Sequence, residues 1–330
     1  MDGEIEEALR FLAQLPSSWL EGYEWPAEIR EQLSDVSAEI AFDGKRLLAL
    51  APEAKSSHFY VPFLTEEYFD LGLLWAEFAM RAGVRAFAIA ACDEMTFEGL
   101  MQRSIPCFRV QLPQHLATRR DYFNRGGFDG KALAIIFSRH QVIRYLLENG
   151  VSTALCDIDA LLLRDPDPSL QYADVVCQRV MYFPKVTALQ WGFSACGGFI
   201  SCAPSAATVR LLRKVIALQR CVSSDQLAWN LALFATNVVW RGSSVYTSPE
   251  ALRAGFVRDA DREFFGRVPT GGLTVKALPA TTFWRHDFVP LDLARAVLVH
   301  PNSPKSAKAK LAILKSAVGA YHWPSRLALA

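Results

Sequence analysis

Residues 151–166 read VSTALCDIDALLLRDP, and this segment is the most informative in the chain. It begins as an apolar run, which predicts a buried strand, and the run leads into the carboxylates of Asp157 and Asp159. In an extended chain, residues i and i+2 point to the same side, so the two carboxylates can converge on one hard divalent cation. Mg²⁺ and Mn²⁺ prefer oxygen ligands, and Mg²⁺ commonly shares them with substrate phosphates. The stretch therefore predicts a Mn²⁺ or Mg²⁺ site that receives a phosphate group.

The segments before this stretch alternate between predicted strands and predicted helices. Residues 131–149 form the clearest helix, because their apolar side chains fall on one stripe and Gly150 follows as a stop. Short connections between such elements imply parallel strands. The predicted fold is therefore α/β, with a mostly parallel central sheet flanked by helices. The other predicted strands are 46–51 (RLLALA), 86–92 (AFAIAAC) and 108–112, and the other predicted helices are 65–83 and 97–103.

We expect one main domain over residues 45–330, preceded by an acidic helical extension over residues 1–44. The main domain would have a nucleotide-binding half, residues 45–160, and an acceptor and catalytic half, residues 161–330. In open α/β sheets, ligands bind beyond the carboxyl ends of the strands. Asp93 directly follows a predicted strand, so it is a candidate nucleotide contact.

Composition narrows the class of protein. A net charge of +1 argues against general binding to nucleic acid or to a membrane surface. No run of 18 apolar residues occurs, so no transmembrane segment is expected, and the first residues lack the pattern of a signal peptide. The 7 cysteines include no CxxC pair, which favours reduced thiols and a cytoplasmic location.

On these residues alone, two other interpretations of Asp157 and Asp159 stay open. A DxD triplet is often an ordinary surface turn. It also occurs in phosphatases, where the first aspartate is the nucleophile. Such sites usually carry Thr or Val two residues after the second aspartate, whereas this chain has Leu161 there.

Four segments in order resemble one known family, the nucleotide-diphospho-sugar transferases of the GT-A fold. The related enzymes include plant arabinosyl and xylosyl transferases and α-galactosyltransferases. CDIDALLLRDP resembles their DxD segment, and GGFI followed by APS resembles their N-x-G-F strand. SDQLAWN resembles their D-Q-x-x-(F/W)-N element, and HPN followed by two lysines resembles their H-x-N…K element. The resemblance covers roughly residues 84–323.

The resemblance implies a role for each matching residue. His300 would be the third metal ligand beside Asp157 and Asp159, and neutral imidazole suits Mn²⁺. Asp225 would hold hydroxyls of the donor sugar, and Gln226 would lie near the anomeric carbon. The residues implied to contact the nucleotide sugar are Asp157, Gly198, Asn302, Lys308 and Lys310, with the helix start at Ser303-Pro304 supplying N–H groups for phosphate.

The implied function is transfer of a sugar from a nucleotide diphosphate, UDP by family habit, to an unidentified acceptor with retention of configuration. Alternatives are a nucleotide-sugar hydrolase, a DxD phosphatase, or a non-catalytic nucleotide-sugar or carbohydrate-binding protein. The chain departs from the family pattern at Cys196, where the family has Asn, and at Leu162, where it has Trp. These departures bear on the substrate and leave the fold unaffected.

Several further side chains have two interpretations. Lys131, at the start of the helix 131–149, and Arg139 either reach the donor or are solvated. Tyr182, Trp191 and Phe193 either border the acceptor or pack in the core. The cluster Trp284-Arg285-His286-Asp287 either borders the acceptor site or fixes a loop.

Overall fold

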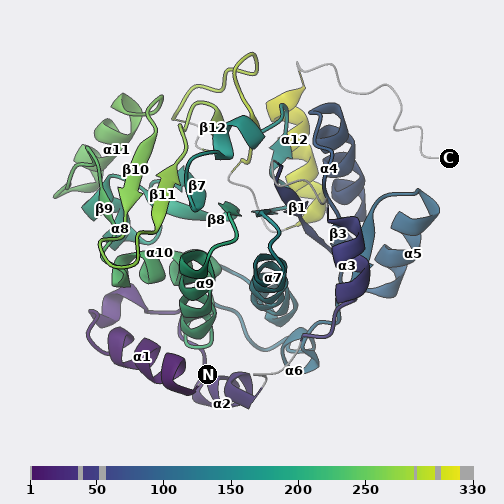
Figure 1. Cartoon of the computed structure of the whole chain (residues 1–330), viewed down its shortest axis with the longest axis horizontal. Coiled ribbons are helices and arrows are strands. Elements are labelled where there is room, and N and C mark those ends of the chain that lie inside the picture. Colours follow the sequence, from purple (N-terminus) through teal and green to yellow (C-terminus); the bar gives the residue numbers. More distant parts are fainter. Residues whose placement is uncertain (1, 36–39, 52–56, 286–287, 302–305, 320–330) are drawn as a thin grey trace.

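The structure is a computed structural model that describes residues 2–35, 40–51, 57–285, 288–301 and 306–319. Its centre is a seven-stranded sheet in the order β1-β5-β8-β7-β11-β10-β9 (Figure 1). Strands β1, β5, β7, β11 and β9 run in one direction, and only β8 and β10 oppose them. The strand bounds are β1 Phe59–Val61, β5 Thr153–Cys156, β7 Val175–Val180, β8 Ser194–Cys202, β9 Val239–Trp240, β10 Phe264–Arg267 and β11 Thr274–Ala277.

Two small sheets extend this centre. The parallel sheet of β2, β3 and β4 continues from β1, because Tyr60 bridges to Phe87 and Ala90 N donates to Pro62 O. The second small sheet, β12-β13-β6, lies beside the end of β5 and brings the chain before His300 close to the residues after Asp159. The bounds are β2 Phe63–Leu64, β3 Ile89–Ala91, β4 Cys107–Arg109, β6 Leu161–Leu162, β12 Phe283–Trp284 and β13 Leu298–Val299.

Helices cover the sheet, as predicted. Helix α7 (Gly130–Glu148) packs on β5, α10 (Asp225–Ala235) on β8, and α9 (Ala206–Gln219) against both helices (Figure 1). No described helix is long and apolar enough to cross a bilayer. The remaining helices are α1 Asp2–Leu12, α2 Ala27–Asp35, α3 Gly44–Leu50, α4 Phe69–Arg81, α5 Glu94–Gln102, α6 Gln114–Ala117, α8 Lys185–Trp191, α11 Pro249–Arg258 and α12 Ala307–Val318.

The prediction of a strand at residues 46–51 was wrong, because this segment lies in α3. Asp43 caps the helix by accepting a hydrogen bond from Arg46 N at 3.0 Å. Leu, Ala, Arg and Lys favour helix, and the segment contains no β-branched residue. An apolar run of six residues does not show by itself whether the segment is a strand or part of a helix. The first strand of the sheet, β1, follows later in the chain.

Helix α7 is fixed in the core by His140. Trp229 Nε1 on α10 donates to His140 Nε2 at 2.8 Å, so the proton of the neutral ring lies on Nδ1 and faces Gln219 Oε1 at 2.7 Å. Burial and the nearby charge of Arg139 lower the pKa of His140 to about 3, against the opposing effect of the Gln219 hydrogen bond. A proton on Nε2 would face the indole N–H, so this network requires a neutral ring.

We therefore predict that acid destabilises the protein through His140. Between the ordinary histidine pKa of about 6.5 and the folded value of about 3, only the unfolded chain takes the proton. The folding stability contributed by the neutral ring is complete near pH 7.5 and falls by about 2 kcal/mol between pH 7.5 and 5. Urea unfolding at pH 7.5, 6 and 5 measures this slope.

The variant His140→Gln should flatten the slope, because an amide can accept from Trp229 without titrating in this range. His115→Gln is the comparison, since His115 lies on α6 outside this network. Partial burial also lowers the pKa of His115, so this variant should flatten the slope less than His140→Gln does. Equal slopes for the wild type and His140→Gln would contradict the assignment.

Candidate functional site

A cavity of about 780 Å³ opens where β5, β8, α7 and α10 meet. Asp157 and Asp159 enter it directly after β5, and Gly197 and Gly198 enter it from the middle of β8. The first residues of α10 and part of α12 complete this wall. The cavity therefore lies beyond the carboxyl end of β5, where ligands of open α/β sheets bind.

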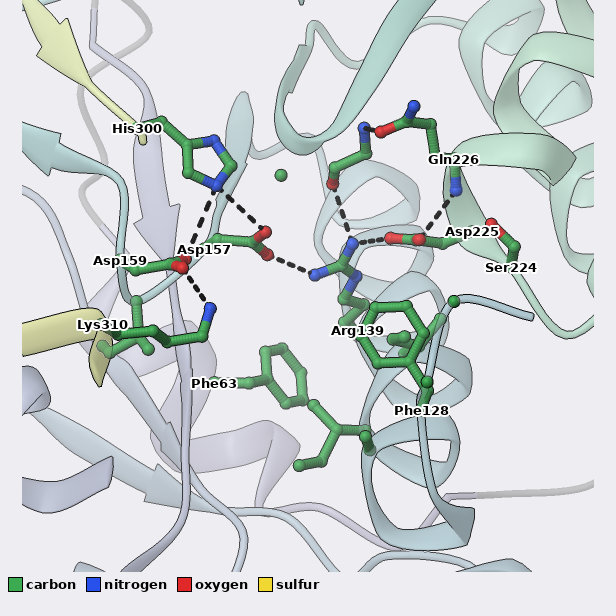
Figure 2. Close-up of a pocket in the computed structure, with 18 of the residues that line it drawn as sticks. Phe63, Phe128, Arg139, Asp157, Asp159, Ser224, Asp225, Gln226, His300 and Lys310 are labelled. Atoms are coloured by element: carbon green, nitrogen blue, oxygen red, sulfur yellow. Dashed lines mark hydrogen bonds and ion pairs between the residues drawn. The ribbon is translucent and has the colours of Figure 1, made fainter. Parts of the chain in front are cut away.

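Asp157, Asp159 and His300 form an acidic cluster, which we call the triad. One ligand atom from each lies within 4.8 Å of the others. His300 Nε2 is 3.6 Å from Asp157 Oδ2 and 3.5 Å from Asp159 Oδ1 (Figure 2). A shell with metal–ligand distances near 2.1 Å separates its donor atoms by about 3 to 4 Å. Two oxygens and one imidazole nitrogen at this spacing fit Mn²⁺ or Mg²⁺.

Cationic side chains already lie against the triad. Lys310 Nζ contacts Asp159, and Arg285 Nη1 lies 2.7 Å from His300 Nδ1. Burial raises the pKa of Asp159, but hydrogen bonding to His300 and the charge of Lys310 outweigh it, so the pKa is well below its usual range. Gln178 on β7 also lies at 3.1 Å from His300 Nδ1. Asp159 and His300 are thus buried beside the partly buried Asp157, and Asp159 is not part of a surface turn. The Asp159 carboxylate is ionised, which favours a positive charge beside it.

Gly197 and Gly198 give the site its floor. A Cβ on Gly198 would lie 2.3 Å from His300 Cε1 and 2.4 Å from Asp157 Oδ2. A Cβ on Gly197 would lie 2.9 Å from Asp225 Oδ2. Only glycine at both positions lets the two carboxylates and the imidazole approach the strand this closely.

Arg139 joins the two halves of the site. Its guanidinium donates to Asp157 Oδ1 at 2.7 Å and to Gly197 O at 2.8 Å, and it pairs with Asp225 (Figure 2). The side chain is only 9% exposed. Burial raises the pKa of Asp157, but Arg139 and then His300 hold it below the ordinary value. The solvated alternative for Arg139 was therefore wrong.

Asp225 and Gln226 begin α10. Ser224 caps this helix by accepting from Leu227 N at 3.3 Å, which leaves the Asp225 carboxylate for Arg139. Gln226 Nε2 donates to Phe183 O, and its Oε1 lies 3.4 Å from Gly197 N. Both side chains line the cavity, so the structure brings the two residues to the triad through Arg139.

The remaining predicted residues lie in different places. Lys131, Gly198 and Lys310 line the cavity, whereas Lys308 is exposed and does not. Asp93 caps α5 and accepts from Thr96 N and Glu66 N, both at 2.9 Å, outside the cavity lining. Asn302 and the Ser303-Pro304 helix start lie outside the described residues, and α12 begins at Ala307 with Ser306 as its cap.

Two of the three aromatic candidates belong to the core. Trp191 and Phe193 are buried and pack against Trp240, with ring centroids 5.8 and 4.9 Å from it. Tyr182 lines the cavity and is 57% exposed.

The sequence analysis did not predict two residues near the site, Gln178 and Tyr23. A polar residue inside the apolar strand run VVCQRV was a usable signal for Gln178, whereas no local pattern marked Tyr23.

Together, the sheet with its covering helices and the cluster at a strand end define an α/β protein with a possible metal-binding triad in its cavity. A sequence model of the nucleotide-diphospho-sugar transferase family matches residues 82–314, more than two thirds of the chain. The chain belongs to this family, as the resemblance predicted. No curated protein matches the sequence.

Solved structures resemble the chain only weakly. The bifunctional glycosyltransferase WbbM shares 11% identity over 55% of this chain and 38% of its own, with a TM-score of 0.40. An active-site mutant of LgtC shares 11% over 81% of this chain and 97% of its own, with a TM-score of 0.43. Mouse xyloside xylosyltransferase 1 shares 13% identity over 54% of this chain and 82% of its own, with a TM-score of 0.35.

We predict that Arg139→Met strongly destabilises the fold. The substitution keeps the apolar stem but leaves Asp225 buried without its partner, and breaking a buried ion pair costs about 3 to 5 kcal/mol. Urea unfolding at pH 7.5 measures the loss. The double variant Arg139→Met with Asp225→Asn should recover part of it, because it removes the buried charge.

Arg109→Met is the matched control. Arg109 pairs with Glu94 at the surface, so its loss should change stability little. Equal effects of Arg139→Met and Arg109→Met would show that Arg139 does not hold the site together.

Proposed function

We propose that this protein is a metal-dependent glycosyltransferase that takes a sugar from a nucleotide diphosphate, with UDP as the expected nucleotide. One observation carries the proposal: the triad and the pair Asp225 and Gln226 face the same cavity and are joined by Arg139. Membership of the nucleotide-diphospho-sugar transferase family supports a nucleotide-sugar donor.

Each group of residues would bind a different part of the nucleotide-sugar donor. Asp157, Asp159 and His300 would hold Mn²⁺ or Mg²⁺, which offsets the charge that builds on the diphosphate leaving group. Lys310 and Lys131 lie in the same cavity and can pair with phosphate oxygens. Asp225 accepts hydrogen bonds from sugar hydroxyls, and Gln226 lies next to it at the reacting carbon. Most of the rate then comes from positioning and electrostatic stabilisation.

We propose retention of configuration through a front-face reaction. Asp225 is held by Arg139, which makes its carboxylate a poor nucleophile for the sugar. The bond from the anomeric carbon to the diphosphate oxygen breaks, and the bond to the acceptor oxygen forms on the same face. The acceptor proton passes to the departing phosphate oxygen.

Other activities of the same cavity give different outcomes. A nucleotide-sugar hydrolase would release free sugar at a rate that no acceptor increases, and a phosphatase would release inorganic phosphate. A non-catalytic binding protein would bind the nucleotide sugar without consuming it. A cytoplasmic location remains part of the proposal, because all seven cysteines are free thiols.

We expect Asp159→Asn to lose both the metal and turnover. Incubation with Mn²⁺ and a panel of nucleotide sugars identifies the donor from release of the nucleotide diphosphate. Turnover of that donor should fall by about 10²-fold or more in Asp159→Asn, because one charged ligand is gone. The electron paramagnetic resonance signal of free Mn²⁺ measures binding independently.

Asp121→Asn is the control, since Asp121 is exposed and pairs with Arg119 away from the cavity. It should bind Mn²⁺ and turn over the donor as the wild type does. Wild-type turnover and Mn²⁺ binding by Asp159→Asn would overturn the metal assignment.

The anomeric outcome tests retention. With an α-linked donor, proton NMR recorded during the reaction should show an α-linked product, identified by the small coupling constant of its anomeric proton where the donor sugar has an axial hydrogen at C2. A β-linked first product would exclude the front-face route and would require a water- or acceptor-activating base on the opposite face.

A further inference from the structure

The N-terminal segment forms part of the cavity wall. Tyr23 lines the cavity, although it lies outside residues 82–314, which match the family. Its ring stacks on Phe183 with centroids 4.7 Å apart and an interplanar angle of 29°. Phe183 O in turn accepts from Gln226 Nε2. Tyr23 is thus connected through Phe183 to Gln226, the residue that we propose to lie near the reacting carbon.

The backbone around Tyr23 is held at the start of α10. Ser223 N and Oγ both donate to Tyr23 O, at 2.6 and 2.9 Å, and Glu24 forms an antiparallel bridge with Val222. Trp25 N donates to Cys221 O at 3.1 Å. These bonds attach residues 23–25 to residues 221–223, which directly precede Ser224. Ser224 caps the helix that carries Asp225 and Gln226.

The other side of the segment contacts the loop before α7. Arg125 N donates to Gly22 O at 2.8 Å, and the rings of Tyr122 and Trp25 stack at 5.3 Å. Gly126, Gly127 and the 64% exposed Phe123 of this loop also line the cavity. Tyr23 therefore lies between two cavity-lining segments. Its own backbone is bonded to Ser223 before α10, and that of its neighbour Gly22 is bonded to the loop before α7.

This end of the cavity suits the ring of a sugar. Tyr23, Tyr182 and Phe123 offer aromatic surface, while Ser224 and Gln226 offer hydrogen-bonding groups beside it. One face of a pyranose consists of C–H groups that pack on an aromatic ring, and its hydroxyls need polar partners. Burial raises the pKa of Tyr23 despite the charge of Arg125, so its hydroxyl stays a neutral donor.

We propose that Tyr23 is a specificity-determining residue that stacks on a pyranose ring of the acceptor, which makes the acceptor class a carbohydrate. The inference rests on the proposed function, since it requires the diphosphate at the triad and the donor sugar at Asp225 and Gln226. The donor then runs from the triad to Gln226, and the space beyond Gln226, at Phe183 and Tyr23, is open to the acceptor.

The test compares Tyr23→Leu with Tyr23→Phe. Leu keeps apolar contact with Phe183 but removes the flat ring, whereas Phe keeps the ring. The probes are p-nitrophenyl α- and β-pyranosides with Mn²⁺ and the donor that the wild type consumes. Tyr23→Leu should raise the KM for the pyranoside about five- to tenfold and the KM for the donor less than about twofold. Tyr23→Phe should stay near the wild type.

Tyr172→Leu is the matched control, because Tyr172 is 90% exposed and does not line the cavity. It should leave both KM values unchanged. Saturation-transfer NMR of a methyl pyranoside with the protein, UDP and Mn²⁺ gives a second readout, and Tyr23→Leu should reduce the transfer.

The outcomes separate this inference from the proposed function. If the wild type consumes no nucleotide sugar, the proposed function fails, and with it the inference that depends on it. If the donor is consumed but Tyr23→Leu leaves the pyranoside KM unchanged, only the role of Tyr23 is wrong. If no pyranoside accelerates donor consumption or shows saturation transfer, the acceptor is not a carbohydrate.

Discussion

The site depends on the buried guanidinium of Arg139. This one side chain on α7 donates to Asp157 after β5 and to the carbonyl of Gly197 on β8, and it pairs with Asp225 at the start of α10. Without Arg139, the buried Asp225 and the partly buried Asp157 would repel each other, and burying Asp225 would cost more free energy. Because Arg139 contacts both, the carboxylate that we propose as a metal ligand and the one that we propose for the donor sugar are held at a fixed separation. The neighbouring His140 fixes the same helix turn to Gln219 and Trp229.

The sequence was most informative where one strand or helix carried a clear pattern. The strand before Asp157, the helix now seen as α7, and the α/β class follow from periodicity and a stop signal. The triad needed more, because His300 lies more than 140 residues after Asp157 and only the family resemblance connected them. The strand prediction for residues 46–51 was wrong, because a short apolar run fits a strand and a helix equally.

Other parts of the site could not be read from local pattern. Whether Arg139 is solvated or buried depends on where Asp157 and Asp225 fold, and these lie 18 and 86 residues away. The place of Tyr23 depends on a bridge between Glu24 and Val222, which no periodicity encodes. Local sequence does not separate Tyr182 from Trp191 and Phe193, because only the packing of the sheet decides which of them faces the cavity.

The absence of a side chain at Gly198 lets two side chains of the triad approach the main chain of the sheet. His300 and Asp157 occupy the space above this residue, so both side chains rest against the backbone of β8, a central strand of the sheet. The backbone of β8 therefore limits how closely these two side chains can lie, while Asp157 follows directly after β5 and His300 directly after β13. A site built this way shares the rigidity of the sheet, and it keeps its shape for as long as the whole domain stays folded.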